Sequence, residues 1–342
     1  MQLKKQFYKN KGVLRQMKTI KIGTLDKAVS RMGLGTWAIG GGSAWGGDRD
    51  KDACIATIQK APELGVNLID TAPGYNFGNS EKIVGEALKS MDREHMVLIT
   101  KFGVVWDREG SLFNKVNGRQ LYWNLSRESI LEEIEKSLER LGVDYIDIYM
   151  SHWQSVEPFF TPIAETMDTL NELKAKGKIR AIGAANVSSE QVEEYLKWGS
   201  LDLVQAKYSV LDRAVEKELL PMCKEHGVAL QAYSPLEMGL LTGVLPRDYK
   251  PVGAQIPKKW FQPENLPKVF DYLDELKPFC KKYQCSIADI NMAWILAQDE
   301  KVVLLSGATS SAQISQNTRS TEIILSKEDA ETIRDMAEAL DR

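Results

Sequence analysis

The chain has 342 residues, of which 43% are hydrophobic and 27% are charged, and its formal net charge is −3 with a pI near 5.9. This ordinary globular composition provides a large core and fits either one large barrel or two medium domains. The slight acidity gives no general attraction to nucleic acid or to anionic membranes, and no apolar run is long enough to span a bilayer. We therefore expect neither partner.

The ends and the cysteines suggest a simple organisation. Residues 1–18 are basic and lack the apolar segment of a secretory signal, so we expect a disordered extension before a single domain at 19–342. The four cysteines form no CxxC pair and have no paired histidines beside them, which argues against a metal site or a disulfide framework. Reduced thiols favour a cytoplasmic location. Nothing in the sequence favours a particular oligomeric state.

Short apolar segments alternate with amphipathic ones after about residue 30. The apolar segments are nearly continuous, which is typical of strands covered on both faces. We predict eight strands, at residues 31–36, 66–70, 96–101, 146–152, 181–186, 203–208, 229–234 and 302–307. Helical periodicity predicts helices at residues 50–61, 126–141, 162–176, 188–197, 215–225, 264–282, 286–298 and 326–340.

Capping signals mark the ends of several predicted helices. Ser126 or Asn124 would cap the helix that follows it, and Asn79 would cap a helix that starts after the segment FGN. Glycine follows four of the helices, where a left-handed C-terminal cap would favour it. These glycines are Gly142, Gly177, Gly199 and Gly227.

Eight strands separated by helices indicate a (β/α)8 barrel. The alternative is a doubly wound open sheet, but the segment GLGTWAIGGGSAWGG lacks GxGxxG in register and the chain contains no P-loop. Between the seventh and eighth strands, residues 238–263 are long and rich in Pro, Gly and Lys. Long insertions on a barrel are usually functional loops, and the glycines and prolines here would suit a hinged one.

The strand ends carry the candidate chemistry. In a barrel, the carboxyl ends of all strands meet at one rim, so Asp70, Lys101 and His152, which end three consecutive predicted strands, would converge. Tyr75 follows Asp70 across a short turn. Each residue alone is weak evidence, because strand-end lysines and lone histidines are usually structural. Their coincidence on consecutive strands favours an active site.

A phenol beside an ammonium indicates proton transfer. The Lys101 ammonium would favour the Tyr75 phenolate and lower a pKa that is ordinarily about 10, while Asp70 would hold the lysine. His152 could hydrogen-bond the same substrate oxygen. Only one carboxylate is evident, which argues against a glycosidase, and no cluster of carboxylates suits a metal. Protonation of a carbonyl oxygen needs a partner that reduces the carbon, and a nicotinamide is the natural hydride source.

At this point the chain resembles the aldo-keto reductases, over essentially everything after about residue 20. The motifs that carry the resemblance are MGLGTW (32–37), NLIDTAPGYNFGNSE (67–81), ITK (99–101), SHW (151–153), IRAIGAANVS (179–188), QAKYS (205–209), AYSPLEMGLLTG (232–243) and SGATSSAQISQN (306–317). The resemblance implies a barrel with an N-terminal β-hairpin at residues 19–29. It also implies NAD(P)H-dependent, reversible reduction of a small aldehyde, ketoaldehyde or sugar.

The resemblance also implies roles for individual residues. Tyr75 would be the general acid, Lys101 and Asp70 would tune it, and His152 would orient the carbonyl. Asn186 and Gln205 would hold the nicotinamide carboxamide, and Tyr233 would stack on the ring. The other implied cofactor contacts are Thr36, Trp37, Asp70, Ser234, Pro235, Leu236, Leu241, Gly243, Gly307, Ala308, Thr309, Gln313, Gln316 and Asn317. The implied substrate pocket contains Trp37, Tyr75, Trp106, His152 and Trp153, with Trp45 as a further candidate wall.

Three departures from the family pattern concern the cofactor. Ala185 stands where many members have serine, and Val244 where many have lysine, a charge that Arg247 or Lys250 could replace. Gly307 and Gln313 stand where NADPH-preferring members often have Lys and Arg, and residues 306–318 contain neither. A 2′-phosphate requires charge-assisted partners, so we expect NAD(H) to be preferred and NADP(H) to remain usable.

Two other functions stay open from the sequence. Some barrels of this kind act mainly as cofactor-binding regulatory subunits of membrane channels, and the four candidate residues permit catalysis without proving it. A sugar isomerase that works without nicotinamide would leave AYSPL and residues 306–317 unexplained.

Overall fold

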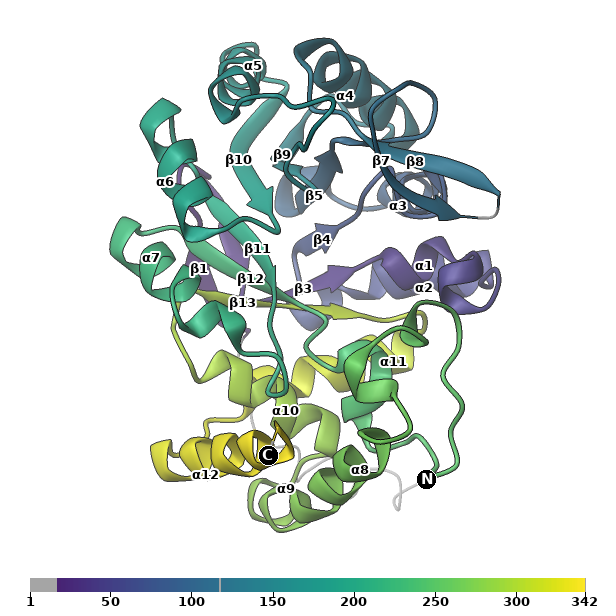
Figure 1. The fold of residues 1–342 in the computed structure, drawn as a ribbon, viewed down its shortest axis with the longest axis vertical. Coiled ribbons are helices and arrows are strands. Elements are labelled where there is room, and N and C mark those ends of the chain that lie inside the picture. Colours follow the sequence, from purple (N-terminus) through teal and green to yellow (C-terminus); the bar gives the residue numbers. More distant parts are fainter. Residues whose placement is uncertain (1–16, 117, 342) are drawn as a thin grey trace, which may run out of the picture.

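The computed structural model describes residues 17–116 and 118–341, and its centre is a closed barrel of eight parallel strands (Figure 1). The strands are β3 (Met32–Gly35), β4 (Leu68–Asp70), β5 (Val97–Phe102), β9 (Ile146–Ser151), β10 (Ile179–Ala185), β11 (Leu203–Lys207), β12 (Ala229–Tyr233) and β13 (Val302–Gly307). The barrel closes through the pairing of β13 with β3. All eight predicted strands are confirmed, with ends that differ by no more than two residues.

Helices surround the barrel and bury their apolar sides against it (Figure 1). They are α1 (Trp37–Gly40), α2 (Lys51–Lys60), α3 (Asn79–Leu88), α4 (Arg127–Leu141), α5 (Ile163–Ala175), α6 (Ser189–Trp198), α7 (Leu219–His226), α8 (Leu266–Glu275), α9 (Lys277–Tyr283), α10 (Ile287–Leu296), α11 (Ser311–Asn317) and α12 (Lys327–Glu338). The predicted helix at 264–282 is in fact two helices, α8 and α9, joined at Leu276. No helix within the described ranges is long and apolar enough to cross a membrane.

The helix caps were predicted only in part. Ser126 caps α4, and its side chain accepts a hydrogen bond from the Ser129 backbone N–H. Gly142, Gly177 and Gly227 have φ of 64°, 73° and 73°, which is the left-handed conformation expected. Gly199 instead has φ 163° and ψ −164°, so the chain leaves α6 in an extended conformation and that prediction was wrong.

Asn79 does not cap α3, contrary to the prediction. Gly78 occupies the N-cap position with φ 83°, and Asn79 is the first residue of the helix. The Asn79 side chain donates from Nδ2 to the carbonyl oxygen of Gly40 at 2.9 Å. This contact ties α3 to the end of α1 rather than to its own backbone.

The N-terminal hairpin of β1 (Thr19–Lys21) and β2 (Ala28–Ser30) closes one end of the barrel, as predicted. Its apolar side chains join the cluster inside the barrel, and Lys27 forms an ion pair with buried Asp147 at 2.9 Å. Asp202, just before β11, accepts from the Thr24 backbone N–H at 2.9 Å. The hairpin therefore covers the end where the strands begin. Of the predicted extension 1–18, residues 1–16 lie outside the described ranges.

A small three-stranded sheet between β5 and α4 was not predicted. It contains β6 (Val104–Val105), β7 (Ser111–Val116) and β8 (Arg119–Trp123), paired in the order β6-β8-β7. Figure 1 shows β7 and β8 projecting beyond the barrel beside α3. The Ser111 hydroxyl donates to the carbonyl oxygen of Val156 at 2.6 Å, which ties this sheet to the loop after β9.

The predicted insertion at 238–263 is a long loop with short 3-10 turns at Glu237–Thr242, Gly253–Gln255 and Lys259–Phe261. Its middle reaches the turn at Ser43–Trp45, which lies shortly after β3. Gly253 has φ 54°, and a Cβ there would lie 2.5 Å from the carbonyl oxygen of Ala44. Only glycine permits this approach, and the contact holds the middle of the loop against the turn at Ser43–Trp45.

Candidate active site

The carboxyl ends of three adjacent strands bring together the predicted catalytic residues. Asp70 is the last residue of β4, Lys101 is the second last of β5, and His152 directly follows β9. The backbone N–H of His152 donates to the carbonyl oxygen of Phe102 at 2.9 Å, which extends the pairing of β5 with β9 by one residue. The chain order β4, β5, β9 is also the order of neighbours in the barrel, so the three side chains share one rim.

The Lys101 ammonium lies at the centre of this group. Its Nζ donates to Asp70 Oδ1 at 2.6 Å, to the carbonyl oxygen of Thr71 at 3.0 Å and to Tyr75 Oη at 3.2 Å. An ammonium has three N–H donors, so each one has a partner. Lys101 and Asp70 are almost completely buried. The ammonium is therefore held in one position, with one hydrogen directed at the phenol.

A tight turn returns Tyr75 to the end of β4. The Gly78 backbone N–H closes the turn by donating to the carbonyl oxygen of Pro73 at 2.7 Å. Asn76 and Phe77 both have positive φ, at 52° and 54°, which is a strained conformation for a residue such as phenylalanine. The Asn76 side chain donates to the carbonyl oxygen of Gly40 at 2.9 Å and helps to hold that conformation.

The pKa of Tyr75 differs from the sequence-based expectation. Burial raises the pKa of the phenol, and the opposing effect of Lys101 is smaller, so the net shift is upward. The prediction of a lowered value considered the neighbouring charge and omitted desolvation. Burial lowers the pKa of Lys101, but Asp70 and Tyr75 outweigh it, so the ammonium stays charged. At neutral pH the pair is thus a protonated phenol beside a charged ammonium.

His152 is neutral in this environment. Burial, with a further contribution from Lys101, lowers the pKa of its imidazole well below the ordinary value. Its ring lies edge-on to that of Tyr75 with centroids 5.6 Å apart. A neutral imidazole has one N–H donor, so His152 can donate to an oxygen beside the phenol without carrying charge.

Asn186, after β10, and Tyr233, at the end of β12, form a chain of hydrogen bonds to the backbone of His152. Asn186 Nδ2 donates to the carbonyl oxygen of His152 at 2.9 Å, and Tyr233 Oη donates to Asn186 Oδ1 at 2.8 Å. Asn186 directly follows β10 and has φ 55°, a conformation that asparagine tolerates better than most residues. Thr36, at the end of β3, donates from both its backbone N–H and its hydroxyl to the carbonyl oxygen of Asp70.

Gln205 connects this group to a residue that the sequence did not indicate. Its Nε2 donates to Asp70 Oδ2 at 2.8 Å and to Gln231 Oε1 at 2.7 Å. Both amide hydrogens are thereby used, which leaves Gln205 Oε1 as the atom able to accept from a bound ligand. A ligand that carries a primary amide, such as the carboxamide of nicotinamide, fits this acceptor. Gln231 is fully buried inside the barrel, and a lone Gln within the apolar strand ALQAY gave no signal of this role.

The match to known proteins agrees with this geometry. The model of the aldo/keto reductase family matches residues 31–338. This chain belongs to the aldo/keto reductase family. It is 61% identical to the NADH-specific methylglyoxal reductase of Escherichia coli K12 over 326 residues, which are 95% of this chain and 100% of that protein.

Solved structures of the family superpose on most of this reductase. The glycerol dehydrogenase of Gluconobacter oxydans is 35% identical, with a TM-score of 0.83 over 93% of this chain and 94% of that one. An aldo-keto reductase of Klebsiella pneumoniae in complex with NADPH is 25% identical, with a TM-score of 0.70 over 94% and 95%. The predicted fold and reaction class, NAD(P)H-dependent reduction of a carbonyl, are thus confirmed.

In this aldo/keto reductase, the loop after β12 has a strained backbone and is held in place by a buried glutamate. Ser234, Glu237 and Met238 have positive φ, at 54°, 45° and 55°. Such residues persist where surrounding contacts fix them. Here buried Glu237 accepts from the Ser209 hydroxyl at 2.5 Å and pairs with Lys207 at 2.9 Å. The sequence did not predict this anchor: in the segment SPLEMG only Ser234, Pro235 and Leu236 were expected to act, as cofactor contacts.

The rest of that loop contains the other residues predicted to contact the cofactor. Pro235 and Leu241 are buried, Leu236 is partly buried and Gly243 is exposed. Gly243 has φ 74°, and a Cβ there would lie 2.7 Å from Cδ1 of Ile287. Arg247, a candidate replacement for the missing lysine, already pairs with Asp271 and Asp274 of α8 at 2.9 and 2.6 Å. The Arg247 guanidinium is therefore already paired with two carboxylates of α8.

The segment after β13 contains the predicted adenosine contacts of the reductase. Gln313 Oε1 accepts from the Thr309 backbone N–H at 2.8 Å, so the start of α11 is organised by an uncharged amide. Asn317 Nδ2 donates to Ser306 Oγ at 3.0 Å and to the carbonyl oxygen of Gly307 at 3.2 Å. Gln316 is exposed and Ala308 is buried.

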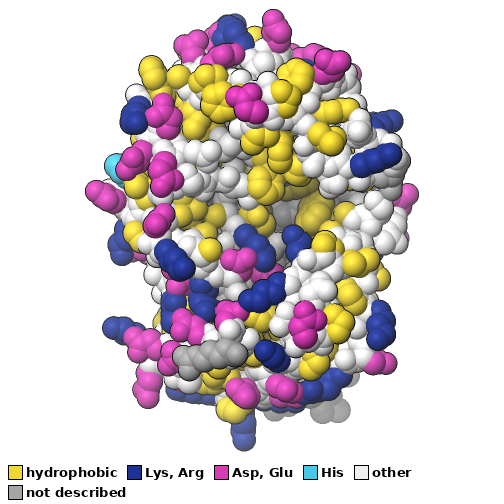
Figure 2. Space-filling view, in the orientation of Figure 1, with side chains coloured by type: hydrophobic (Ala, Val, Ile, Leu, Met, Phe, Trp, Pro, Cys, Tyr) yellow, Lys and Arg dark blue, Asp and Glu magenta, His cyan; other side chains and the backbone are white. Residues whose placement is uncertain are grey.

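Aromatic side chains gather around Tyr75 and on the small sheet. The Trp37 ring lies 6.2 Å from the Tyr75 ring and 5.1 Å from that of Trp45. Of a second group of aromatic side chains, only Trp106 and Trp153 were predicted to line the substrate pocket. Trp106 packs against Phe77 at 5.6 Å, and Trp153 packs against Phe113 and Trp123 of the small sheet at 5.9 and 6.3 Å. Figure 2 shows a hollow near the middle of one face, with hydrophobic side chains above it and charged ones below.

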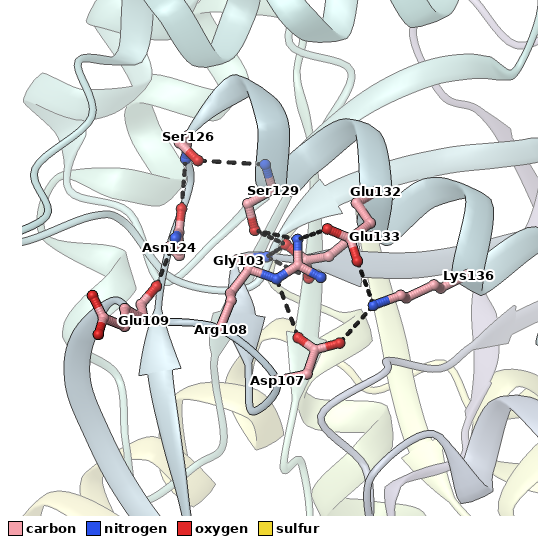
Figure 3. A network of polar contacts seen from close by, with 10 residues as sticks. All are labelled: Gly103, Asp107, Arg108, Glu109, Asn124, Ser126, Ser129, Glu132, Glu133 and Lys136. Atoms are coloured by element: carbon pink, nitrogen blue, oxygen red, sulfur yellow. Dashed lines mark hydrogen bonds and ion pairs between the residues drawn. The ribbon is translucent and has the colours of Figure 1, made fainter.

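A polar network fixes the segment that carries Trp106 (Figure 3). Arg108 donates to Asp107 at 3.1 Å and pairs with Glu132 of α4 at 2.9 Å. Lys136, one turn further along α4, pairs with both carboxylates at 2.6 Å. Beneath this layer, the buried Glu133 side chain holds the end of β5. The loop before β7 is thus clamped to α4, and Trp106 is positioned by its neighbours in sequence.

Proposed function

We propose that this enzyme reduces methylglyoxal and related small ketoaldehydes with NADH as the preferred cofactor. The observation that carries the proposal is the Tyr75 phenol, which stays protonated while it lies 3.2 Å from the charged Lys101 Nζ. The 61% identity to a protein named NADH-specific methylglyoxal reductase supports the choice of substrate and cofactor. The aromatic groups around Trp37 and Trp106 suit a small substrate.

Each step assigns one task to one side chain. Tyr75 transfers its Oη proton to the carbonyl oxygen as negative charge develops there. Lys101 stabilises the resulting phenolate, and Asp70 keeps the ammonium in place. Neutral His152 donates its N–H to the same oxygen, which fixes the orientation of the carbonyl. When bound, NADH supplies the hydride that adds to the carbonyl carbon.

The remaining predicted residues hold the cofactor. Gln205 Oε1 and Asn186 receive the carboxamide, Tyr233 stacks on the nicotinamide ring, and Thr36 and Trp37 border it. The loop after β12 and the segment after β13 take the pyrophosphate and the adenosine. The preference for NADH follows from residues 306–318, which contain no Lys or Arg to pair with a 2′-phosphate. NADPH remains a usable, weaker cofactor.

The proposal extends to the setting of the enzyme. Residues 19–342 form one catalytic domain, and the enzyme acts in the cytoplasm. Four free cysteines within the described residues fit that location.

The test is turnover of methylglyoxal by the wild type and by Tyr75→Phe, with NADH and NADPH compared at limiting concentration. We expect Tyr75→Phe to lower kcat by about a thousandfold while NADH binding stays within about twofold. Tyr145→Phe is the matched control, because Tyr145 bonds Lys27 near the hairpin end of the barrel. Unchanged turnover in Tyr75→Phe would remove the proposed mechanism, and a strong preference of the wild type for NADPH would remove the cofactor assignment.

A further inference from the structure

Two cysteines lie side by side where α9 ends. Gln284 takes the left-handed conformation with φ 52° and ψ 46°, and the Cys285 backbone N–H donates to the carbonyl oxygen of Cys280 at 3.0 Å. This bond defines a Schellman cap, in which the residues at the two cysteine positions regularly contact each other. A disulfide requires two Cα atoms roughly 4.4–6.8 Å apart, and a backbone hydrogen bond that joins the two cysteines directly is compatible with that separation.

The two thiols differ from the other cysteines in access to solvent. Cys54 and Cys223 are buried, whereas Cys280 and Cys285 are only partly buried. Cys285 also lines a surface cavity of about 450 Å³ together with Arg319. The neighbouring Cys285 thiol lowers the pKa of Cys280, which favours the thiolate that reacts with oxidants.

We propose that Cys280 and Cys285 form an oxidation site, which a peroxide converts into an internal disulfide and which thereby weakens NADH binding. The Cys280 thiolate attacks one oxygen of hydrogen peroxide, and with one proton taken up this gives a sulfenic acid and one water. The Cys285 thiol then attacks that sulfur, which forms the S–S bond and releases a second water. The pair loses two electrons, and the peroxide is reduced to two waters.

The link to the cofactor passes through the first turn of α10. Ser286, next to Cys285, caps α10 and accepts from Gln316 Nε2 at 3.4 Å. Ile287 packs against Gly243, and Asn291 Nδ2 donates to the carbonyl oxygen of Leu241 at 3.2 Å. The start of α10 therefore contacts both loops assigned to NADH. This coupling rests on the proposed function, whereas formation of the disulfide does not.

The test treats the full-length enzyme with a small excess of hydrogen peroxide and follows two readouts. Peptide mass mapping without cofactor should find a Cys280–Cys285 disulfide, with Cys54 and Cys223 still reduced. Fluorescence titration should then show that the Kd for NADH has risen by about fivefold or more, a typical strength for coupled sites. Dithiothreitol should restore both readouts.

Two variants separate the parts of the proposal. Cys285→Ser and Cys280→Ser should bind NADH as the reduced wild type does and should lose the response to peroxide. Absence of the disulfide peptide at peroxide levels that oxidise partly buried methionines such as Met222 would overturn the oxidation site. A disulfide that forms while the Kd for NADH stays constant would overturn the coupling. Failure of the reduced enzyme to bind NADH at all would contradict the proposed function instead.

Discussion

Both carboxylate oxygens of Glu133 accept a hydrogen bond from the Gly103 backbone N–H, each at 3.1 Å. Gly103 lies two residues beyond Lys101, so a helix on the outside of the barrel holds the strand end that carries the ammonium of the proposed active site. The Ser129 hydroxyl donates to the same carboxylate at 3.0 Å. Burial raises the pKa of Glu133 to about 8, despite the opposing effects of these hydrogen bonds and of Arg108.

This raised pKa predicts a dependence of stability on pH. The folded protein keeps the Glu133 proton up to about pH 8, whereas the unfolded chain loses it near pH 4.5. Unfolding therefore releases a proton between these values, and the free energy of unfolding falls by about 1.4 kcal/mol per pH unit through this window. Thermal denaturation from about pH 5 to about pH 9 should show the Tm of the wild type falling relative to that of Glu133→Gln. Glu132→Gln, at the exposed neighbour, should follow the wild type, and parallel curves for all three proteins would contradict the assignment.

The buried pair of Asp70 and Lys101 makes a second prediction. Asp70→Asn removes the anion and leaves a buried ammonium without its charged partner, so we expect the free energy of unfolding to fall by about 3 kcal/mol. The same variant should lose most of its kcat. Urea denaturation measures the first effect, and adding Lys101→Met should recover part of the stability while activity stays low. A double variant less stable than Asp70→Asn would contradict this account.

Glu237 should affect cofactor binding more than chemistry. Glu237→Gln weakens the anchor that holds the strained loop after β12, so we expect the KM for NADH to rise about tenfold, with kcat within about twofold of the wild type. Asp212→Asn is the matched control, because Asp212 also pairs with Lys207 at 2.9 Å but lies outside that loop. Steady-state kinetics with saturating aldehyde provide the measurement. Equal effects in both variants would assign the change to Lys207 rather than to the loop.

Cofactor preference should respond to one added charge. Gln313→Arg places a guanidinium in the segment assigned to the adenosine, and we expect the ratio of kcat/KM for NADPH to that for NADH to rise about tenfold or more. Gln313→Leu removes the contact with Thr309 without adding charge and should leave the ratio unchanged. A rise in both variants would show that charge is not the cause.

The barrel and the convergence of the candidate catalytic residues could be predicted because their signals are local. Strands covered on both faces read as short apolar runs, and topology alone brings the ends of β4, β5 and β9 together. Gln231 and Glu237 could not be predicted in the same way. Gln231 acts through Gln205 on the neighbouring strand β11, and Glu237 acts through Ser209 and Lys207. Nothing in the segments of Gln231 and Glu237 indicates these partners.

Other misses have different physical causes. The strands β7 and β8 are only partly buried, so their composition resembles that of a polar loop. Gly199 follows a helix as a capping glycine would, but its extended φ depends on how the chain reaches the next strand. The direction of the Tyr75 pKa shift depends on how much protein surrounds the phenol, and neighbouring residues in the sequence do not report that.

In the proposed mechanism, the full set of partners around Lys101 also determines how Tyr75 recovers its proton. Lys101, Asp70, Gln205 and Gln231 form a chain that leads into the closed interior of the barrel, and all four are buried. Tyr75, in contrast, is only partly buried. The donated proton must therefore be replaced from water that reaches the exposed part of Tyr75. The Tyr75 phenolate can thus be reprotonated only after the alcohol product has left the site. Reprotonation is therefore linked to product release.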